Sequence, residues 1–228
     1  MHYDLIIFDC DGTLVDSETL YNTITSELLN EMGYPEYTPM LCVELFGGRS
    51  WTDIRLILED RHQVKMPHDI VRSYADIANS RMDAELKVVE HALETVHHLY
   101  NKIKICVASN GERGNILKSL KIAKLDPYFP EHIVFSKIQV PRAKPFPDLF
   151  LYAANIMNVD PAKTLVIEDS VAGVQAGIAA GMDVAGFIGT AHDKEAHIMA
   201  LTGAGAHRIL DSFIHIPDAL THGKDWLK

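Results

Sequence analysis

The sequence predicts a doubly wound, Rossmann-like parallel α/β sheet with an inserted all-helical domain. Short apolar runs rich in branched residues, typical of buried parallel strands, alternate with helical patterns through the second half of the chain. The region from Ser17 to Arg81 breaks this alternation, because it contains helical patterns and no good strand. We therefore expect an α/β core at residues 1–14 and 83–228 and a helical insertion at residues 15–82.

The expected elements follow from these runs and periods. The strands are expected at Leu5–Phe8, Ile103–Ala108 and Thr164–Ile167, with a weaker pair at Ile133–Phe135 and Val184–Ile188. The core helices are expected at residues 90–100, 114–120, 148–157 and 171–180. The insertion is expected to hold helices at residues 18–32, 39–46, 50–63 and 68–82.

One small and apolar stretch, Ala172–Gly189, has the appearance of a membrane span. Gln175 and Asp183 interrupt it, and its glycines weaken it as one continuous helix. We therefore predict a helix whose glycine face packs closely on the sheet and which ends at Gly181 in the left-handed conformation, followed by a strand.

Composition narrows the possible partners. The chain has 228 residues, 47% hydrophobic and 23% charged, which is ordinary for a globular protein. Its formal net charge of −10 and its lack of a Lys/Arg cluster argue against binding to nucleic acids or to anionic membranes. The three cysteines suggest neither a disulfide framework nor a zinc site, so we expect the protein to lie in the reducing cytoplasm. We expect a monomer or weak dimer that binds a small molecule.

Polar residues gather directly after the expected strands, where open α/β sheets bind their ligands. These residues are Asp9 and Asp11 after the first strand, Ser109 and Asn110 after the second, and Glu168 and Asp169 after Thr164–Ile167. Lys144 precedes Pro145 in an irregular segment before the helix at Asp148. The sequence therefore predicts four acidic groups, a hydroxyl and a lysine at one edge of the sheet.

Such an acidic cluster is unfavourable without a cation, because neighbouring carboxylates raise each other's pKa. Mg²⁺ prefers oxygen ligands and commonly sits on one or two carboxylates and a substrate phosphate. With the metal and Lys144 neutralising a phosphoryl group, Asp9 is suited to attack phosphorus. Asp11 is then suited to protonate the leaving group and later to deprotonate water.

These residues resemble the motifs of the haloacid dehalogenase superfamily, in its phosphatase and phosphoglucomutase-like branch. The first motif is resembled by the segment from Asp9 to Ser17, and the others by Ser109, by Lys144-Pro145 and by the segment from Glu168 to Gly173. The helical insertion is similar to the cap domain of that branch. Four motifs in the right order make the resemblance specific, and it covers nearly the whole chain.

The resemblance implies a role for each residue. Asp9 would be the nucleophile and Asp11 the general acid/base. The metal would be held by Asp9, by the backbone carbonyl of Asp11, directly by Asp169, and by Glu168 either directly or through water. Ser109, Asn110 and Lys144 would bind the oxygens of the transferring phosphoryl group.

Arg49 follows Gly47 and Gly48 between two helices of the insertion. This segment resembles the substrate-specificity loop of the branch, and its simpler interpretation is an interhelical turn. We expect the guanidinium group of Arg49 to bind a second anionic group of the substrate.

The expected function is therefore a Mg²⁺-dependent phosphohydrolase that acts through a phospho-aspartate on a small phosphorylated metabolite, a sugar phosphate or phosphorylated sugar acid by family analogy. A signalling receiver module needs neither the insertion nor Asp11, and displacement of halide needs neither Asp11 nor the acidic pair at Glu168. A β-phosphoglucomutase-type mutase stays the alternative. The resemblance places a histidine of those mutases at Tyr21, or at Leu20 in a shifted register, and neither side chain repeats imidazole chemistry.

Overall fold

A computed structural model describes residues 2–47, 49, 51–218, 222 and 226 of the chain. Its internal contacts divide the chain into two compact units, Met1–Asp16 with Lys87–Lys228, and Ser17–Leu86. Both boundaries lie a few residues after the expected positions 14 and 82. The helix that ends the second unit continues to Glu85, and Val15–Asp16 (β2) pairs antiparallel with Lys87–Val88 (β3) where the chain leaves and re-enters the first unit.

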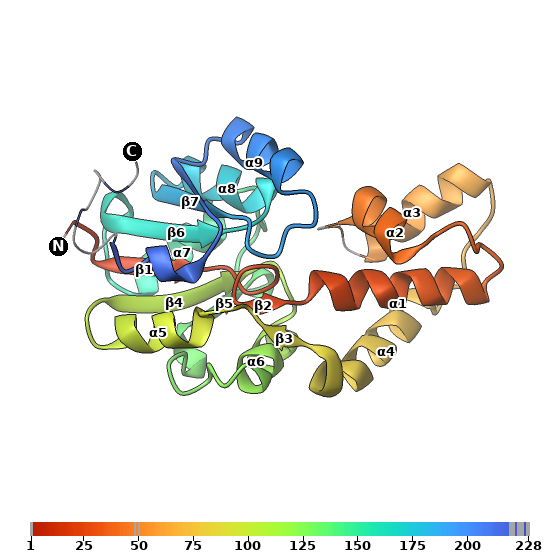
Figure 1. Cartoon of the computed structure of the whole chain (residues 1–228), viewed down its shortest axis with the longest axis horizontal. Coiled ribbons are helices and arrows are strands. Elements are labelled where there is room, and N and C mark those ends of the chain that lie inside the picture. Colours follow the sequence, from red (N-terminus) through yellow and green to blue (C-terminus); the bar gives the residue numbers. More distant parts are fainter. Residues whose placement is uncertain (1, 48, 50, 219–221, 223–225, 227–228) are drawn as a thin grey trace. The chain divides into compact units, whose positions relative to one another are not determined.

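The first unit contains the expected doubly wound parallel sheet (Figure 1). In the described residues, six strands follow the order β5-β4-β1-β6-β7-β8, and each pair is parallel. The strands are β1 Leu5–Phe8, β4 Lys104–Ser109, β5 Val134–Ser136, β6 Thr164–Glu168, β7 Asp183–Phe187 and β8 Arg208–Leu210. The sequence pattern predicted all of them except β8.

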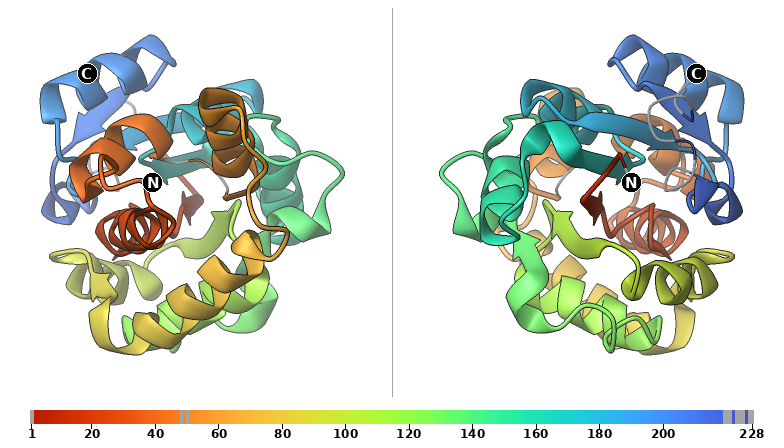
Figure 2. Two further views of the ribbon diagram at one scale, coloured as in Figure 1. Left: turned by 90° about the vertical axis from the view of Figure 1, so that its right-hand side faces the viewer. Right: turned by 90° about the vertical axis from the view of Figure 1, so that its left-hand side faces the viewer.

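Helices cover both faces of this sheet (Figure 2). They are α5 Ala92–Tyr100, α6 Arg113–Ile122, α7 Asp148–Ile156, α8 Val171–Ala179 and α9 Lys194–Gly203, with short 3-10 turns at Glu131–Ile133, Lys137–Gln139, Pro161–Lys163 and Phe213–His215. Helix α9 was not expected from the sequence. Its single fully buried side chain, Leu201, produces no amphipathic period, although Asp193 caps its start by accepting from the Ala196 N–H.

The central strand β1 is buried on both faces, as its continuous apolar run predicts. Leu5 and Ile7 belong to one core cluster with residues of α7, α8 and α9. Phe8 contacts the rings of Phe129 and Phe213, at centroid distances of 6.1 and 6.0 Å. The strand that carries Asp9 is thus anchored in a packed core.

The second unit is helical and has its own core. Its helices are α1 Glu18–Glu31, α2 Pro39–Phe46, α3 Trp51–His62 and α4 Ile70–Glu85. Buried apolar side chains from all four helices form one cluster that includes Leu29, Phe46, Leu58 and Ile70. Each of the four expected helices is present, and α2 has the expected bounds because Thr38 caps it and Pro39 begins it.

The segment Ala172–Gly189 contains α8 and β7, as predicted. Gly181 follows α8 with a φ of +72°, the left-handed conformation that favours glycine. A side chain at Gly177 would place its Cβ 2.6 Å from Cγ2 of Val184, so the bare glycine face of α8 contacts β7 directly. In the described part of the chain, no helix has the length and apolar character needed to cross a membrane.

Gly177→Ala is expected to lower the free energy of unfolding by about 1–3 kcal/mol, because the new methyl group overlaps a buried valine. Urea unfolding measures this change. Gly203→Ala in α9 is the matched control, since its Cβ would meet nothing within 4 Å, and it is expected to leave stability unchanged or to raise it by at most about 1 kcal/mol. Equal stability of both variants would show that α8 does not need the close approach.

Candidate active site at the carboxyl edge of the sheet

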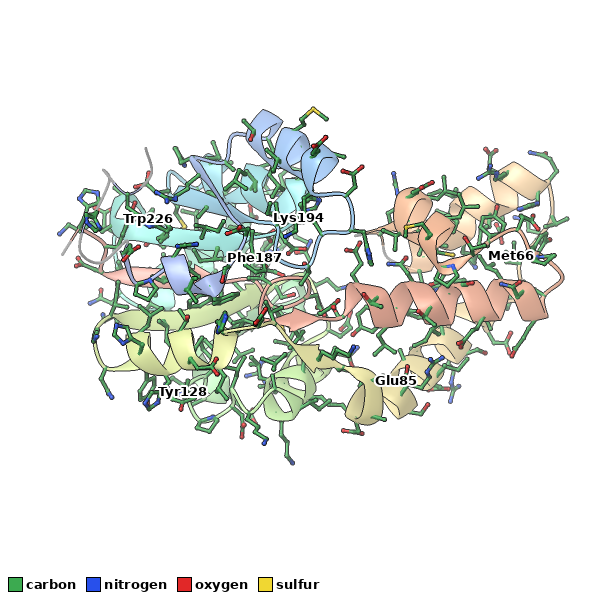
Figure 3. The ribbon with its side chains drawn as sticks, in the orientation of Figure 1. Met66, Glu85, Tyr128, Phe187, Lys194 and Trp226 are labelled. Atoms are coloured by element: carbon green, nitrogen blue, oxygen red, sulfur yellow. The ribbon has the colours of Figure 1, made fainter. Side chains whose placement is uncertain are left out.

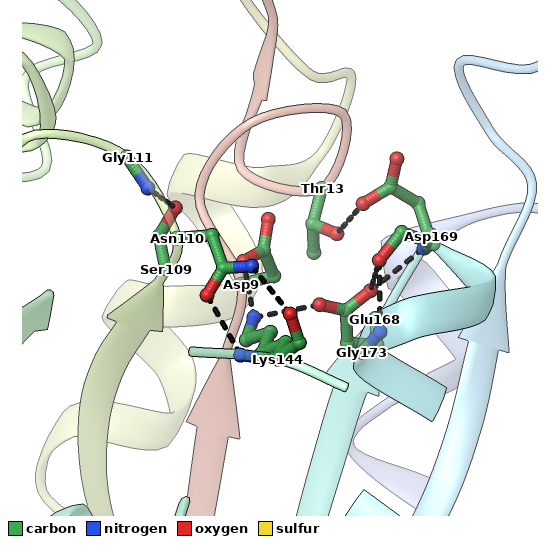
Figure 4. A network of polar contacts seen from close by, with 10 residues as sticks. Asp9, Thr13, Ser109, Asn110, Gly111, Lys144, Glu168, Asp169 and Gly173 are labelled. Atoms are coloured by element: carbon green, nitrogen blue, oxygen red, sulfur yellow. Dashed lines mark hydrogen bonds and ion pairs between the residues drawn. The ribbon is translucent and has the colours of Figure 1, made fainter. Parts of the chain in front are cut away.

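Strand order places the predicted site residues together. Strand β1 lies between β4 and β6, with Phe8 in register with Val107 and with Ile167. The residues that follow each of these strands therefore emerge side by side at the carboxyl edge (Figure 4). They come from sequence positions that are far apart, and only the sheet brings them together.

Lys144 lies at the centre of the site. Its Nζ is 2.6 Å from Oδ1 of Asp9 and 2.6 Å from Oε1 of Glu168, and the side chains of all three residues are buried. The ammonium group also lies 4.7 Å from the centroid of the Phe150 ring. Two ion pairs thus join the loop after β1 and the last residue of β6 to the segment before α7 (Figure 4).

Burial and the ion pairs of Lys144 shift the pKa values of this cluster. Burial acts to lower the pKa of Lys144, but Asp9 and Glu168 outweigh it and raise this pKa well above its ordinary range. Burial raises the pKa of Asp9 to about 7, Lys144 opposes this rise, and Glu168 and Asp11 add to it. The ammonium group is therefore firmly charged, whereas the Asp9 carboxylate is costly to ionise without further positive charge.

Asn110 holds the main chain of Lys144. Its Nδ2 donates to the Lys144 carbonyl at 3.1 Å, and its Oδ1 accepts from the Lys144 N–H at 3.1 Å. The sequence predicted that Asn110 would bind phosphoryl oxygens, but the polar atoms of its side chain are directed to the backbone of residue 144 instead. The side-chain amide of Asn110 thus positions Lys144, and the contact of Asn110 with phosphoryl oxygens stays a prediction.

Ser109 and Asp11 both lie close to Gly111. The Ser109 Oγ accepts from the Gly111 N–H at 3.1 Å, a bond that does not use the proton of the hydroxyl group. A Cβ at Gly111 would be 3.3 Å from Oδ2 of Asp11 and 3.4 Å from Oγ of Ser109. The structure thus brings the Ser109 hydroxyl near the Asp11 carboxylate.

Asp169 lies against the loop after β1. Its Oδ1 accepts from Oγ1 of Thr13 at 3.0 Å. A Cβ at Gly12 would lie only 2.0 Å from Oδ2 of Asp169, and Gly12 has a φ of +78°. Glycine is therefore required here twice, for the left-handed backbone and for the close approach of the carboxylate.

Glu168 is engaged with protein groups at both carboxylate oxygens. Oε1 pairs with Lys144, and Oε2 accepts from the Ser170 N–H at 2.7 Å and from its hydroxyl at 2.9 Å. A Cβ at Gly173 would lie 1.8 Å from Oε1, so a glycine is also needed beside this carboxylate. Of the two roles left open by the sequence, this arrangement favours an effect on a metal through water.

The donor chemistry fits Mg²⁺. Asp9, Asp11 and Asp169 would offer oxygen ligands, and Lys144 pairs with the first of them. No group of three or more His, Cys, Asp or Glu side chains within the described residues is arranged to hold a metal ion. A protein site for Mg²⁺ requires only one or two carboxylates, because water and substrate phosphate supply the other ligands.

Thr13, Ser170 and Gly173 lie within the predicted motif segments, but their support of this site was not predicted. Ser170 caps α8 by accepting from the Gly173 N–H at 3.0 Å while it donates to Glu168. The available signal was a serine directly before the helical run that begins at Val171.

Arg49 belongs to the helical unit. Its side chain is exposed, and its N–H donates to the Phe46 carbonyl at 2.9 Å. Gly48, which we included in the same predicted loop, lies outside the described residues. The substrate contact of Arg49 stays a prediction.

Comparison with known proteins identifies relatives that match most of the chain. Residues 6–187 match the family model described as haloacid dehalogenase-like hydrolase. The chain is 32% identical to 6-phosphogluconate phosphatase of Escherichia coli over 84% of its own length and 85% of that protein. It is 29% identical to a phosphorylated carbohydrates phosphatase of Thermotoga maritima, with 86% of this chain and 91% of that protein covered.

A solved structure is similar over nearly the full length. A HAD family hydrolase from Deinococcus radiodurans, crystallised with bound phosphate and sodium, superimposes with a TM-score of 0.82 at 29% identity. The match covers 99% of this chain and 98% of that one. The order of elements described above is thus shared with an experimental structure.

The raised pKa of Asp9 predicts how stability depends on pH. Because the folded-state pKa of about 7 exceeds the ordinary value of 3.8, the folded protein retains a proton that the unfolded chain releases. The stabilisation from this group is fully present below about pH 4 and is lost as the pH rises through about 7. Asp9→Asn has no such proton, so the free energy of unfolding of the wild type is expected to fall relative to that of the variant over this range.

Urea unfolding of both proteins in EDTA at constant ionic strength, from about pH 4.5 to 8, measures the difference. Parallel profiles would contradict the prediction, because they would show that Lys144 keeps Asp9 ionised throughout.

Proposed function

The chain belongs to the haloacid dehalogenase-like hydrolase family, and on that premise we propose that it hydrolyses the phosphoric monoester of a small phosphorylated carbohydrate. The observation that carries this proposal is the buried pairing of Asp9 with Lys144 at the carboxyl end of β1. A carboxylate beside a fixed ammonium group, with a serine hydroxyl and a second aspartate near it, is suited to phosphoryl transfer.

Asp9 is the nucleophile in this proposal. One of its carboxylate oxygens forms a bond to phosphorus as the bond from phosphorus to the ester oxygen breaks, which leaves a phospho-aspartate. Lys144 neutralises the charge on the phosphoryl oxygens, and the Ser109 hydroxyl donates a hydrogen bond to one of them. Asn110 and Glu168 keep the Lys144 ammonium group in place, the former through the main chain and the latter through the ion pair.

Asp11 is the general acid and base. It gives a proton to the leaving alkoxide in the first step and takes one from the attacking water in the second, which releases inorganic phosphate and restores Asp9. Gly12 has a positive φ, so the chain turns directly after Asp11, two residues beyond Asp9.

Asp9, the Asp11 carbonyl and Asp169 would hold Mg²⁺, with Glu168 acting through water. When bound, the ion neutralises the phosphoryl oxygens and the acidic side chains together. The contact of Asp169 with Gly12 and Thr13 supports this assignment, because it places a third aspartate at the loop that carries the other two.

The substrate class rests on the relatives. Their names specify 6-phosphogluconate and phosphorylated carbohydrates, and we propose a sugar phosphate or phosphorylated sugar acid for this chain. We further propose that the unit Ser17–Leu86 is a cap domain and that Arg49 binds a second anionic group of the substrate. Hydrolysis is favoured over mutase chemistry because Tyr21, beside Tyr74 at a centroid distance of 6.3 Å, offers no imidazole to retain the phosphoryl group for return to a sugar.

Purified protein with Mg²⁺ is expected to release inorganic phosphate from 6-phosphogluconate or hexose phosphates without a bisphosphate activator. Asp9→Asn removes the nucleophile and is expected to lower kcat by at least about a thousandfold, and EDTA is expected to stop the wild type until Mg²⁺ is restored. A phosphate-release assay with circular dichroism as a folding check measures these effects. Asp4→Asn is the matched control, because Asp4 pairs with Lys163 on the surface of the same unit.

Substantial activity in Asp9→Asn would overturn the nucleophile assignment. Conversion of a hexose 1-phosphate to its 6-phosphate faster than phosphate release would replace the phosphatase with the mutase.

Arg49→Ala is expected to raise KM about tenfold or more for a substrate with a second anionic group, since a charge-assisted hydrogen bond is lost. Hydrolysis of an aryl phosphate, which lacks that group, is expected to stay unchanged. Arg72→Ala serves as the control, because Arg72 is exposed on α4 of the same unit. Equal losses on both substrates would show that Arg49 supports folding and not recognition.

A further inference from the structure

The connection between β7 and α9, residues 188–197 including the first turn of α9, contacts both acidic loops of the site. Figure 3 labels Phe187 and Lys194, the last residue of β7 and the first residue of α9. Oγ1 of Thr190 donates to the Gly12 carbonyl at 2.7 Å. Nε2 of His197 lies 2.6 Å from the Asp169 carbonyl, and because a carbonyl oxygen only accepts, this nitrogen must carry the proton.

These two bonds close a ring of contacts. Thr13, directly after Gly12, donates to Oδ1 of Asp169. The loop after β1 and the loop after β6 are therefore joined to each other, and each is joined separately to the β7–α9 connection. A movement of either loop would stretch a hydrogen bond to Thr190 or His197 as well as the bond between the loops.

The contact of His197 reaches the nucleophile through a short chain of bonds. The peptide group between Asp169 and Ser170 accepts from His197 at its carbonyl and donates to Oε2 of Glu168 at its N–H, at 2.7 Å. Glu168 pairs with Lys144, and Lys144 pairs with Asp9. The orientation of this one peptide group therefore affects both Asp169 and the ion pairs of Lys144.

The connection is itself well anchored. The Ile188 N–H donates to the Leu210 carbonyl at 2.8 Å, which joins its start to β8. At the other end, the His197 N–H donates to the Asp193 carbonyl at 3.0 Å, and the Asp193 side chain accepts from Ala196. Thr190 and His197 thus extend from a fixed frame.

We propose that Thr190 and His197 are positioning residues that set the separation of Asp9 and Asp11 from Asp169, and thereby the affinity of the site for Mg²⁺. The inference rests on the proposed function for its metal, but it concerns two side chains outside the four sequence motifs. Groups that orient metal ligands without touching the metal commonly change its affinity by about 10–100-fold when they are removed.

The test compares variants that remove each donor with variants that retain it. Thr190→Val and His197→Phe remove the donors at similar size, while Thr190→Ser and His197→Gln keep a donor. Two quantities are measured for each protein: the Mg²⁺ concentration that gives half-maximal phosphate release, and the Mg²⁺ concentration that gives half the maximal rise in Tm without substrate. His192→Phe, at an exposed position of the same connection, is the control.

Both Mg²⁺ concentrations are expected to rise about tenfold or more in Thr190→Val and His197→Phe, to return toward the wild-type value in Thr190→Ser and His197→Gln, and to stay unchanged in His192→Phe. A lower Tm with unchanged Mg²⁺ concentrations would overturn the proposal, because it would assign the two side chains to stability alone. If His197→Phe does not fold, the Thr190 pair gives the same decision.

Failure of the proposed function has a different signature. Wild-type protein that gains Tm with Mg²⁺ but releases no phosphate from any ester would refute the phosphatase assignment. The Tm measurements alone would then test the positioning role. A tenfold rise in the Mg²⁺ concentration that gives half the maximal rise in Tm would support it, and an unchanged concentration would refute it.

Discussion

The site depends on one buried ammonium group. Lys144 is paired at 2.6 Å with both Asp9 and Glu168, in surroundings where all three side chains are excluded from solvent. Loss of one partner from a buried ion pair leaves an uncompensated charge at a cost of about 3–5 kcal/mol. Neighbouring contacts support these ion pairs: Asn110 binds the main chain of Lys144, and the Ser170 hydroxyl donates to the second carboxylate oxygen of Glu168.

The charges of the site are not balanced by this lysine. Asp11 and Asp169 add two more carboxyl groups at the same edge of the sheet. Burial raises the pKa of Asp9 to about 7, and Glu168 and Asp11 add to this rise. The cost of ionising Asp9 in the folded protein would be offset by a cation bound at these carboxylates, such as the proposed Mg²⁺. Preorganised charges of this sort act most strongly on groups whose charge changes during the reaction.

Glycines set how closely the acidic groups approach the loops. Gly12 and Gly173 each leave room for a carboxylate where a Cβ would lie within about 2 Å of it. Gly177 likewise leaves room for Val184, so that α8 packs closely against β7. Thr190 and His197 contact two backbone carbonyls of the acidic loops, those of Gly12 and Asp169.

The sequence by itself determined the elements whose cues are local. The bounds of β1 and α2 match the predicted ranges because a continuous apolar run and a Thr-Pro helix start are properties of neighbouring residues. The position of Asp9, Ser109 and Glu168 at strand ends likewise followed from local apolar runs, and the structure brings these strand ends together at one edge of the sheet. Strand β8 and helix α9 were not predicted. Strand β8 has only three residues, and α9 has a single buried leucine, so neither produces a clear hydrophobic period.

The tertiary structure alone decided which groups these residues contact. The amide of Asn110 binds the main chain of a residue 34 positions away, and Thr190 binds a carbonyl 178 positions away. The unit boundary likewise depends on the pairing of β2 with β3, strands of two residues each. Periodicity reports which face of an element is buried, but a hydrogen-bond partner is selected by the packing of the whole sheet, and that information is absent from any short stretch of the chain.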